Sequence, residues 1–329
     1  MNVLKTIRSV EWWEYKLPPL LAIGYAAALK SGTSFIDLVP HILFLLLSVT
    51  IGAIYVSIIN DLTDIEIDLA SGKKNRMANV STLWRWLLPV TCLLIGAIFM
   101  YYFYPDRLSL LLYLMPWMCF SLYSFEPVRL KDKGIWGVFA DASGSHIFTS
   151  LLMISSVSFY AGAAIDWFFF CSTAIWAFCY GLRGILWHQF YDRDNDITAG
   201  VNSYAVNVSP QQFKSKEVFL FLLELTAISV MLLRIQLILP FVFLLLYGAL
   251  SLIKIYSLKD IPVIIISPDK HFFILMGDFY QVFLPIALLI TAAAKDPYVV
   301  LVLIVHVALF PKNTSNALRQ FRDFLLTKL

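Results

Sequence analysis

The chain has 329 residues, of which 60% are hydrophobic and 14% charged, and its mean hydropathy is +0.76. Soluble domains average about 45–50% apolar and about 25% charged residues, so this composition excludes a soluble globular domain and predicts an integral membrane protein. The formal net charge of +3 gives no reason to expect a nucleic-acid partner, but the positions of the charges are informative.

The apolar residues fall into ten stretches that are long enough, or nearly long enough, to cross a bilayer as helices, which takes about 20 residues. These stretches lie near residues 17–36, 38–60, 82–104, 108–124, 135–159, 165–190, 216–234, 236–256, 272–294 and 297–311. Because the last stretch is short, the sequence predicts an all-α, polytopic transmembrane bundle of nine or ten spans.

Positively charged residues are concentrated in alternate loops, and such loops stay in the cytoplasm. They precede span one and fill the even-numbered connections: Lys5, Arg8, Lys16, Lys73, Lys74, Arg76, Arg85, Arg129, Lys131, Lys133, Arg193, Lys214, Lys216, Lys259 and Lys270. This bias predicts a cytoplasmic N-terminus. It also favours ten segments, because the positively charged residues after the last segment then lie on the cytoplasmic side of the membrane.

Two acid-rich strings stand out, and each follows an apolar stretch. The first, residues 60–68, reads NDLTDIEID, and the second, residues 188–196, reads HQFYDRDND. Both contain Asp-x-x-x-Asp, and both fall on the predicted cytoplasmic side. A solvated helix end explains one such string, but two strings with the same spacing in related positions indicate a metal site.

The two strings also suggest an internal repeat. They align at an offset of 128 residues, which pairs Asn60-Asp61 with His188-Gln189. Four spans separate them, so the halves would share one orientation and the strings would face each other across a central lateral cavity. We therefore predict one membrane domain over residues 1–329, with pseudo-repeats near 10–134 and 135–270 and an additional segment, 271–329.

The acids suit a magnesium site. Residues three, four and seven apart share a helix face, so Asp61, Asp64 and Asp68 would form one stripe and Asp192 and Asp196 a matching one. Mg²⁺ prefers one or two carboxylates together with waters and phosphate oxygens. Two such clusters on opposite walls predict Mg²⁺ ions that share a diphosphate.

The nearby cations and the apolar surroundings fit a substrate in which a diphosphate leaves from a hydrophobic hydrocarbon chain. Lys73, Arg76, Arg129 and Lys131 follow the first string or the fourth span, and Arg and Lys are common phosphate ligands. The positive-inside bias alone would also place cations in these loops. Metals and cations stabilise a departing diphosphate, and a dry, aromatic cavity protects a carbocation.

Several ionisable groups lie inside predicted spans, where they are costly and are functional candidates by default. Asp141 and His146 are candidates to orient or deprotonate an acceptor, and His188, nearer the acids, could serve either substrate. Arg183 lies nine residues before Asp192, about 13 Å deeper at the helical rise. The alternative for these groups is a buried ion pair, such as Arg183 with Asp141.

The strings resemble the two signatures of the UbiA-type intramembrane prenyltransferases. The first reads Asn60-Asp61-x-x-Asp64-x-x-x-Asp68 and the second Asp192-x-x-x-Asp196-x-x-x-Gly200-x-x-Ser203. Residues 123–134 are similar to the family's loop after the fourth helix, and Lys16-Leu-Pro18 is similar to its Lys/Arg-x-Pro motif. The chain departs from the family's pattern at Met77 and Glu126, where members often have Pro.

The resemblance extends over nearly the whole chain and implies a bundle of about nine helices around a lateral cavity. It implies an enzyme that uses Mg²⁺ to ionise a prenyl diphosphate and attaches the prenyl group to an acceptor. By position, Asp61, Asp64 and Asp68 would bind one metal with help from Asn60, and Asp192 and Asp196 would bind the second. Diphosphate contacts would come from Lys73, Arg76, Arg129 and Lys131, with Tyr123 beside the leaving group or the cation.

The sequence favours a Mg²⁺-dependent prenyltransferase that uses a polyprenyl diphosphate and an aromatic or lipid acceptor in the membrane. A terpene cyclase of the same architecture, in which the cation is captured by the substrate's own double bonds, is the alternative. A non-enzymatic lipid transporter is less favoured, because the acids lie at the membrane surface rather than mid-span.

Overall fold

A computed structural model describes residues 9–328, so the predicted loop cations Lys5 and Arg8 lie outside the described residues. The structure is about 79% helical, as predicted for an all-α protein. The helices are α2 (Ser9–Ser31), α3 (Phe35–Thr63), α4 (Ile65–Ala70), α5 (Thr82–Phe103), α6 (Arg107–Ser124), η1 (Leu130–Asp132), α7 (Ile135–Ala142), η2 (Ser143–Ile147), α8 (Phe148–Tyr160), α9 (Trp167–Tyr191), α10 (Arg193–Ala199), α11 (Tyr204–Asn207), α12 (Pro210–Ile235), α13 (Ile238–Tyr256), η3 (Phe279–Phe283), α14 (Leu284–Ala293), α15 (Val299–Leu309) and α16 (Pro311–Lys328). Two short parallel strands, β1 (Ile261–Val263) and β2 (Phe272–Ile274), complete the elements.

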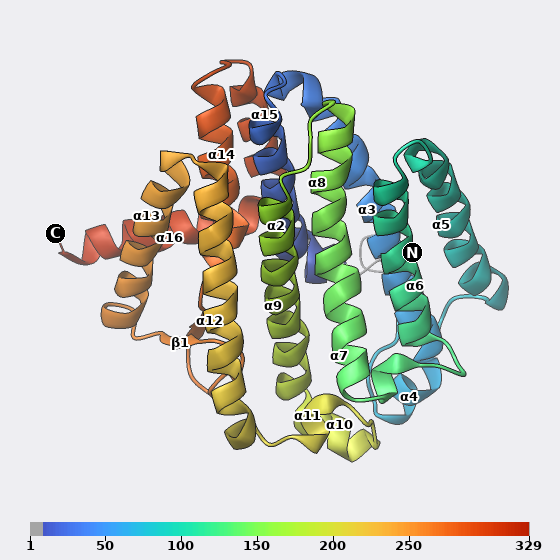
Figure 1. Ribbon diagram of the computed structural model, residues 1–329. Helices are drawn as coiled ribbons and strands as arrows, with labels where there is room; N and C mark the ends of the chain where they lie inside the picture. Colours follow the sequence, from blue (N-terminus) through green and yellow to red (C-terminus); the bar gives the residue numbers. More distant parts are fainter. Residues whose placement is uncertain (1–8, 329) are drawn as a thin grey trace.

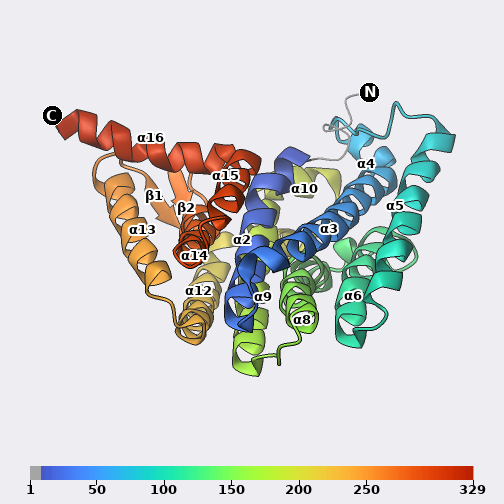
Figure 2. The same cartoon turned by 90° about the horizontal axis from the view of Figure 1, so that it is seen from above.

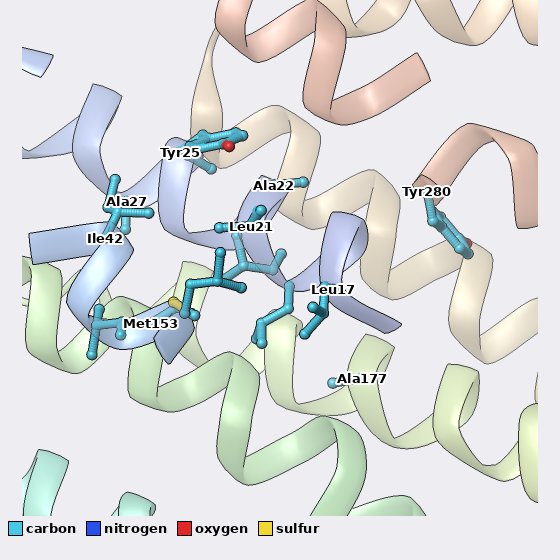
Figure 3. Packing of buried hydrophobic residues seen from close by; sticks show 14 of the residues in the cluster. Leu17, Leu21, Ala22, Tyr25, Ala27, Ile42, Met153, Ala177 and Tyr280 are labelled. Carbon is cyan, nitrogen blue, oxygen red and sulfur yellow. The ribbon is translucent and has the colours of Figure 1, made fainter. Parts of the chain in front are cut away.

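Helix α2 is the centre of the bundle (Figures 1 and 2). Every residue from 17 to 28 is buried, as expected for a helix that is apolar all round. Figure 3 shows Leu17, Leu21 and Tyr25 of this helix among side chains of its neighbours, including Met153 of α8 and Ala177 of α9. The other long helices are therefore arranged around α2.

The outer helices expose their apolar side chains. On α5, Trp84, Trp86, Leu94 and Tyr101 are all more than half exposed, and α13 exposes a similar set. Soluble proteins rarely show apolar patches of this size, whereas lipid covers them in a membrane. Among the described residues, α3, α5, α9, α12 and α13 are long and apolar enough to span. The chain is therefore an integral membrane protein.

The prediction of nine or ten spans remains a prediction. Helices α15 and α16 would count as one further span only as a pair, and they are bent by 90° at their junction. The predicted span 17–36 is wrong at its end, since α2 stops at Ser31 and Gly32 adopts a left-handed φ of 77°. The predicted span 135–159 is one helical path, α7–η2–α8, with a π turn in its middle.

The predicted span 272–294 is wrong at its beginning. Residues 272–274 form strand β2 beside β1, and the helical path starts only at Phe279. The guanidinium of Arg183 donates hydrogen bonds to the backbone oxygens of Ile264 (3.3 Å) and Leu275 (2.7 Å). These bonds satisfy backbone oxygens of the strand segment that a helix would have paired internally.

The two acid strings lie at one end of the bundle. Helices α4 and α10, which carry the second half of each string, lie next to each other in both views (Figures 1 and 2). A hydrogen bond of 3.2 Å from the Asn202 side chain to the backbone oxygen of Asp132 also joins the segment after α10 to the loop after α6 there. This end of the molecule is where the candidate site is built.

Candidate active site

The first acid string is a helix with a break rather than a continuous helix. Helix α3 ends at Thr63, and Asp64 adopts φ −107° and ψ 4° before α4 begins. The Thr63 hydroxyl donates to the backbone oxygen of Ile59 at 2.9 Å, and this type of back-bonding bends helices. The predicted single stripe of three acids is therefore interrupted at Asp64, and each acid has different neighbours.

Asp64 lies against two of the predicted diphosphate-binding cations. Its Oδ1 accepts hydrogen bonds from Arg129 Nη2 at 2.8 Å and from Lys131 Nζ at 2.5 Å. Burial lowers the pKa of Lys131, and the attraction of Asp64 offsets only part of that shift. The structure thus brings predicted metal-binding and phosphate-binding groups into direct contact.

Asp61 and Asp68 are connected through Asn75. The Asn75 side-chain amide donates to the backbone oxygen of Asp61 at 2.7 Å and to Asp68 Oδ2 at 2.8 Å. The Asp61 side chain is fully buried and lies 3.7 Å from Arg76 Nη1. Asn75 therefore fixes the geometry of the first string, a role that the sequence analysis did not assign.

Arg129 is positioned by its own loop. It adopts a left-handed φ of 38°, and its Nε donates to Asp132 Oδ2 at 2.6 Å. Burial lowers its pKa, but the hydrogen bonds to Asp132 and Asp64 outweigh burial, so the pKa of Arg129 is raised. Its Nη1 also donates to the backbone oxygens of Thr63 and Ser124, which ties the loop to the ends of α3 and α6.

Asn60, near the end of α3, and Tyr123, near the end of α6, lie where these two helices meet. The Ser124 hydroxyl donates to Asn60 Oδ1 at 2.5 Å. The carboxylates of Asp64 and Asp196 both act electrostatically on the Tyr123 hydroxyl. Tyr123 therefore lies within electrostatic range of carboxylates from both acid strings, and its position beside the leaving group stays a prediction.

The second string is built like the first, with a break at an aspartate. Asp192 caps the end of α9 and precedes α10, and the Asp196 N–H donates to the Asp192 backbone oxygen at 2.9 Å. Burial raises the pKa of Asp196, although Ser203 and Lys73 act in the opposite direction. Lys73, in the loop after the first string, therefore lies within electrostatic range of the second.

Of the predicted acceptor-side residues, His188 lies in the last turn of α9, one turn before Asp192, and Asp141 lies on α7. His188 is exposed, and its ring packs edge-on to Trp187 at 4.9 Å. Asp141, on α7, is half-buried and, like Asp64 and Asp196, acts electrostatically on Tyr123. His146 lies in the π turn η2, with its ring 5.1 Å from that of Tyr180.

Arg183 is paired, but not with the residue that the sequence analysis considered. Its Nη1 donates to Glu224 Oε1 at 2.5 Å, and the Tyr280 hydroxyl donates to the same oxygen at 2.8 Å. Arg183 and Glu224 are both almost completely buried. The suggested pair with Asp141 is therefore wrong, and Arg183 holds α9, α12 and the strand segment together.

An apolar cavity lies beside the acid strings. It is enclosed by α2, α3, α6, η2 and α8, and its lining includes Lys16, Ser57, Phe120, Trp117 and Tyr113. The π turn contributes Gly144 and Ser145. Such π bulges are frequent at functional sites. The cavity offers an apolar chain a place next to the charged end of the bundle.

The acid strings suit a magnesium ion better than a metal held by protein alone. Within the described part of the chain, no three His, Cys, Asp or Glu side chains gather as a metal-binding group. Mg²⁺ does not need such a group, because one or two carboxylates suffice when phosphate oxygens and waters complete its shell. The oxygen-only donors also disfavour zinc, which prefers Cys and His.

The fold is shared with solved structures. A UbiA homolog from Archaeoglobus fulgidus bound to GPP and Mg²⁺ matches with a TM-score of 0.57 and 17% identity, covering 94% of this chain and 100% of that chain. A structure of a UbiA homolog from the same organism bound to DMAPP and Mg²⁺ matches with a TM-score of 0.51 and 14% identity, covering 97% and 99%. A third, bound to Cd²⁺, matches with a TM-score of 0.56 and 18% identity, covering 89% and 98%.

The sequence comparison identifies the family directly. No curated protein matches this chain. The model of the UbiA prenyltransferase family matches residues 17–262, which is most of the chain and includes both acid strings and the loop between α6 and α7. The chain belongs to the UbiA prenyltransferase family.

Proposed function

We propose that this protein is a Mg²⁺-dependent prenyltransferase that moves a prenyl group from a prenyl diphosphate to an aromatic or lipid acceptor within the membrane. The observation that carries the proposal is the meeting of two acid strings and buried cations beside an apolar cavity. The structures of UbiA homologs with GPP or DMAPP and Mg²⁺ support it.

The protein's own groups would hold the diphosphate from two sides. Asp61, Asp64 and Asp68 on one side, and Asp192 and Asp196 on the other, are the oxygen donors for the metal. When bound, Mg²⁺ would neutralise the charge that develops on the diphosphate as its bond to carbon breaks. Lys73, Arg76, Arg129 and Lys131 would bind phosphate oxygens, with the Arg129 guanidinium giving a two-pronged contact.

The carbon left behind would be protected by the cavity. The C–O bond breaks with its electron pair leaving on the diphosphate, and the acceptor's nucleophilic atom then bonds to that carbon and loses a proton. A dry cavity prevents water from competing for the carbon. Tyr123 would lie beside the reacting carbon, and Asp141, His146 and His188 are the candidates to orient the acceptor or take its proton.

The proposal includes the orientation of the site. The positive-inside bias of the loops supports a cytoplasmic position for both acid strings. It also supports a chain made of two pseudo-repeats, near 10–134 and 135–270, each with its acid string after its second long helix. The orientation can be tested with Asp194→Cys, because the Asp194 side chain is exposed. The introduced cysteine is labelled with a thiol reagent added to one side of sealed vesicles or the other.

The decisive experiment is a substrate screen on purified protein in lipid nanodiscs. Dimethylallyl, geranyl, farnesyl and geranylgeranyl diphosphates are incubated with Mg²⁺, with and without aromatic and lipid acceptors, and products are identified by mass spectrometry. A prenylated acceptor and Mg²⁺-dependent diphosphate release are expected. No release from any donor, or full release in excess EDTA, would contradict the proposal.

A UbiA-type terpene cyclase is the second candidate, and one observation favours it. Aromatic rings of Tyr55, Tyr113, Trp117 and Phe120 line the cavity, and such faces stabilise a cation that moves along a folded chain. The same screen separates the two functions. A cyclic hydrocarbon or alcohol formed from the donor alone would identify a cyclase.

A further inference from the structure

The cavity has a direction, because the helices that line it run away from the acid strings. On α3 the lining residues extend from Ser57, one turn before Asp61, to Ser48. At the helical rise, Ser48 lies about 20 Å from Asp61 along the helix axis. The residues around Ser48 therefore form the far end of the cavity.

Tyr113 lies at this far end. Helix α6 runs antiparallel to α3, with Ser124 at the acid strings and Tyr113 eleven residues back along the helix. The Tyr113 hydroxyl lies 3.5 Å from the backbone oxygen of Ser48, and its side chain is buried. A chain that extends along the cavity from the acids would end against this ring.

Trp117 lies on the cavity wall one helical turn nearer the acid strings than Tyr113, and its position depends on Gly96. A Cβ atom at Gly96 of α5 would lie 2.9 Å from Trp117 Cζ2, which is closer than real Cβ contacts. A Cβ at Gly52 of α3 would lie 3.8 Å from the same atom. The Tyr55 ring packs at 4.9 Å from the indole. The indole thus occupies space that exists because Gly96 has no side chain.

We propose that Trp117, seated against Gly96, and Tyr113 at the far end together limit the length of the prenyl donor. The depth of about 20 Å suits donors no longer than geranylgeranyl diphosphate. This inference rests on the proposed function. A methyl group at Gly96 displaces the indole away from α5, toward the cavity, and shortens the accepted chain. Removing the indole lengthens it.

The test compares variants that change the cavity in opposite directions. Trp117→Ala, Trp117→Phe and Gly96→Ala are compared with wild type and with Gly248→Ala, a helical glycine with open space around its Cβ. Diphosphate release is measured for geranyl, farnesyl, geranylgeranyl and octaprenyl diphosphates with Mg²⁺. The shift in melting temperature that each donor causes gives a second readout, independent of turnover.

Wild type and Gly248→Ala are expected to prefer the short donors. Trp117→Ala should raise the ratio of octaprenyl to geranyl turnover at least tenfold, with Trp117→Phe intermediate, and Gly96→Ala should lower the ratio of geranylgeranyl to geranyl turnover several-fold. Folded variants that all keep the wild-type ranking would overturn the inference and leave the proposed function intact. A wild type that neither binds nor ionises any donor would overturn both.

Discussion

The two acid strings share their spacing and their helix break, but they differ in how firmly the protein holds them. In the first string, Asp64 contacts Arg129 and Lys131, and Asn75 bridges Asp61 and Asp68. In the second, no ion pair among the described residues holds Asp192 or Asp196. The first string is thus preorganised by the chain, whereas the described residues supply no comparable ion pair to the second.

The largest expected effect comes from removing one carboxylate in each string. Asp64→Ala and Asp192→Ala should each lower the rate of diphosphate release by about 10²–10³-fold, the range seen when a preorganised charge-stabilising group is lost. Release from geranyl diphosphate measures this. Asp194→Ala is the matched control, because its side chain is 98% exposed and should leave the rate unchanged.

Asparagine variants at the same two positions test the difference in preorganisation. Asp64→Asn should lower the melting temperature, because Arg129 and Lys131 lose the negative charge that they share, while Asp192→Asn should leave it nearly unchanged. Thermal unfolding in nanodiscs without Mg²⁺ measures both. Equal losses in the two variants would contradict the contrast between the strings.

Removal of Arg129 should have the next largest effect on turnover. Arg129→Ala should reduce diphosphate release by about 10²-fold and Arg129→Lys by less, because lysine keeps the charge but loses the fork geometry. The kinetic measurement with geranyl diphosphate resolves the two variants. Lys133→Ala, an exposed cation of the same loop, is the control and should behave like wild type.

Asn75 should affect the metal requirement more than the maximal rate. Its amide positions two acids of the first string, so Asn75→Ala should raise the Mg²⁺ concentration for half-maximal activity by about tenfold. Titration of Mg²⁺ at saturating donor measures this. Asn207→Ala is the control, because the hydrogen bonds of Asn207 stay within the connection between α10 and α12. It should leave the Mg²⁺ concentration for half-maximal activity unchanged.

The smallest effect is expected at His188. Its side chain is exposed, and its ring packs edge-on to that of Trp187. His188→Ala should therefore change diphosphate release less than threefold, a size typical of a surface contact. A loss comparable to that of Asp192→Ala would show that His188 acts directly on the donor.

Much of this architecture is predictable from local patterns. Apolar length identified the helices α3, α5, α9, α12 and α13, which are long and apolar enough to span. The repeated Asp-x-x-x-Asp spacing identified the two acid strings, and the loop charges identified the cations beside the first. The bridge made by Asn75 and the pairing of Arg183 with Glu224 depend on contacts between distant segments, which a single sequence does not display. The false start of the span at residue 272 has the same cause, because Arg183 binds the oxygens that flank the strands.

Diphosphate release from geranyl diphosphate, measured side by side for wild type and Asp192→Ala in nanodiscs, tests the central claim most directly. The account predicts Mg²⁺-dependent release by wild type, its loss in EDTA, and a drop of at least 10²-fold in the variant. Equal release by wild type and variant, or release by wild type that is unaffected by EDTA, would contradict it.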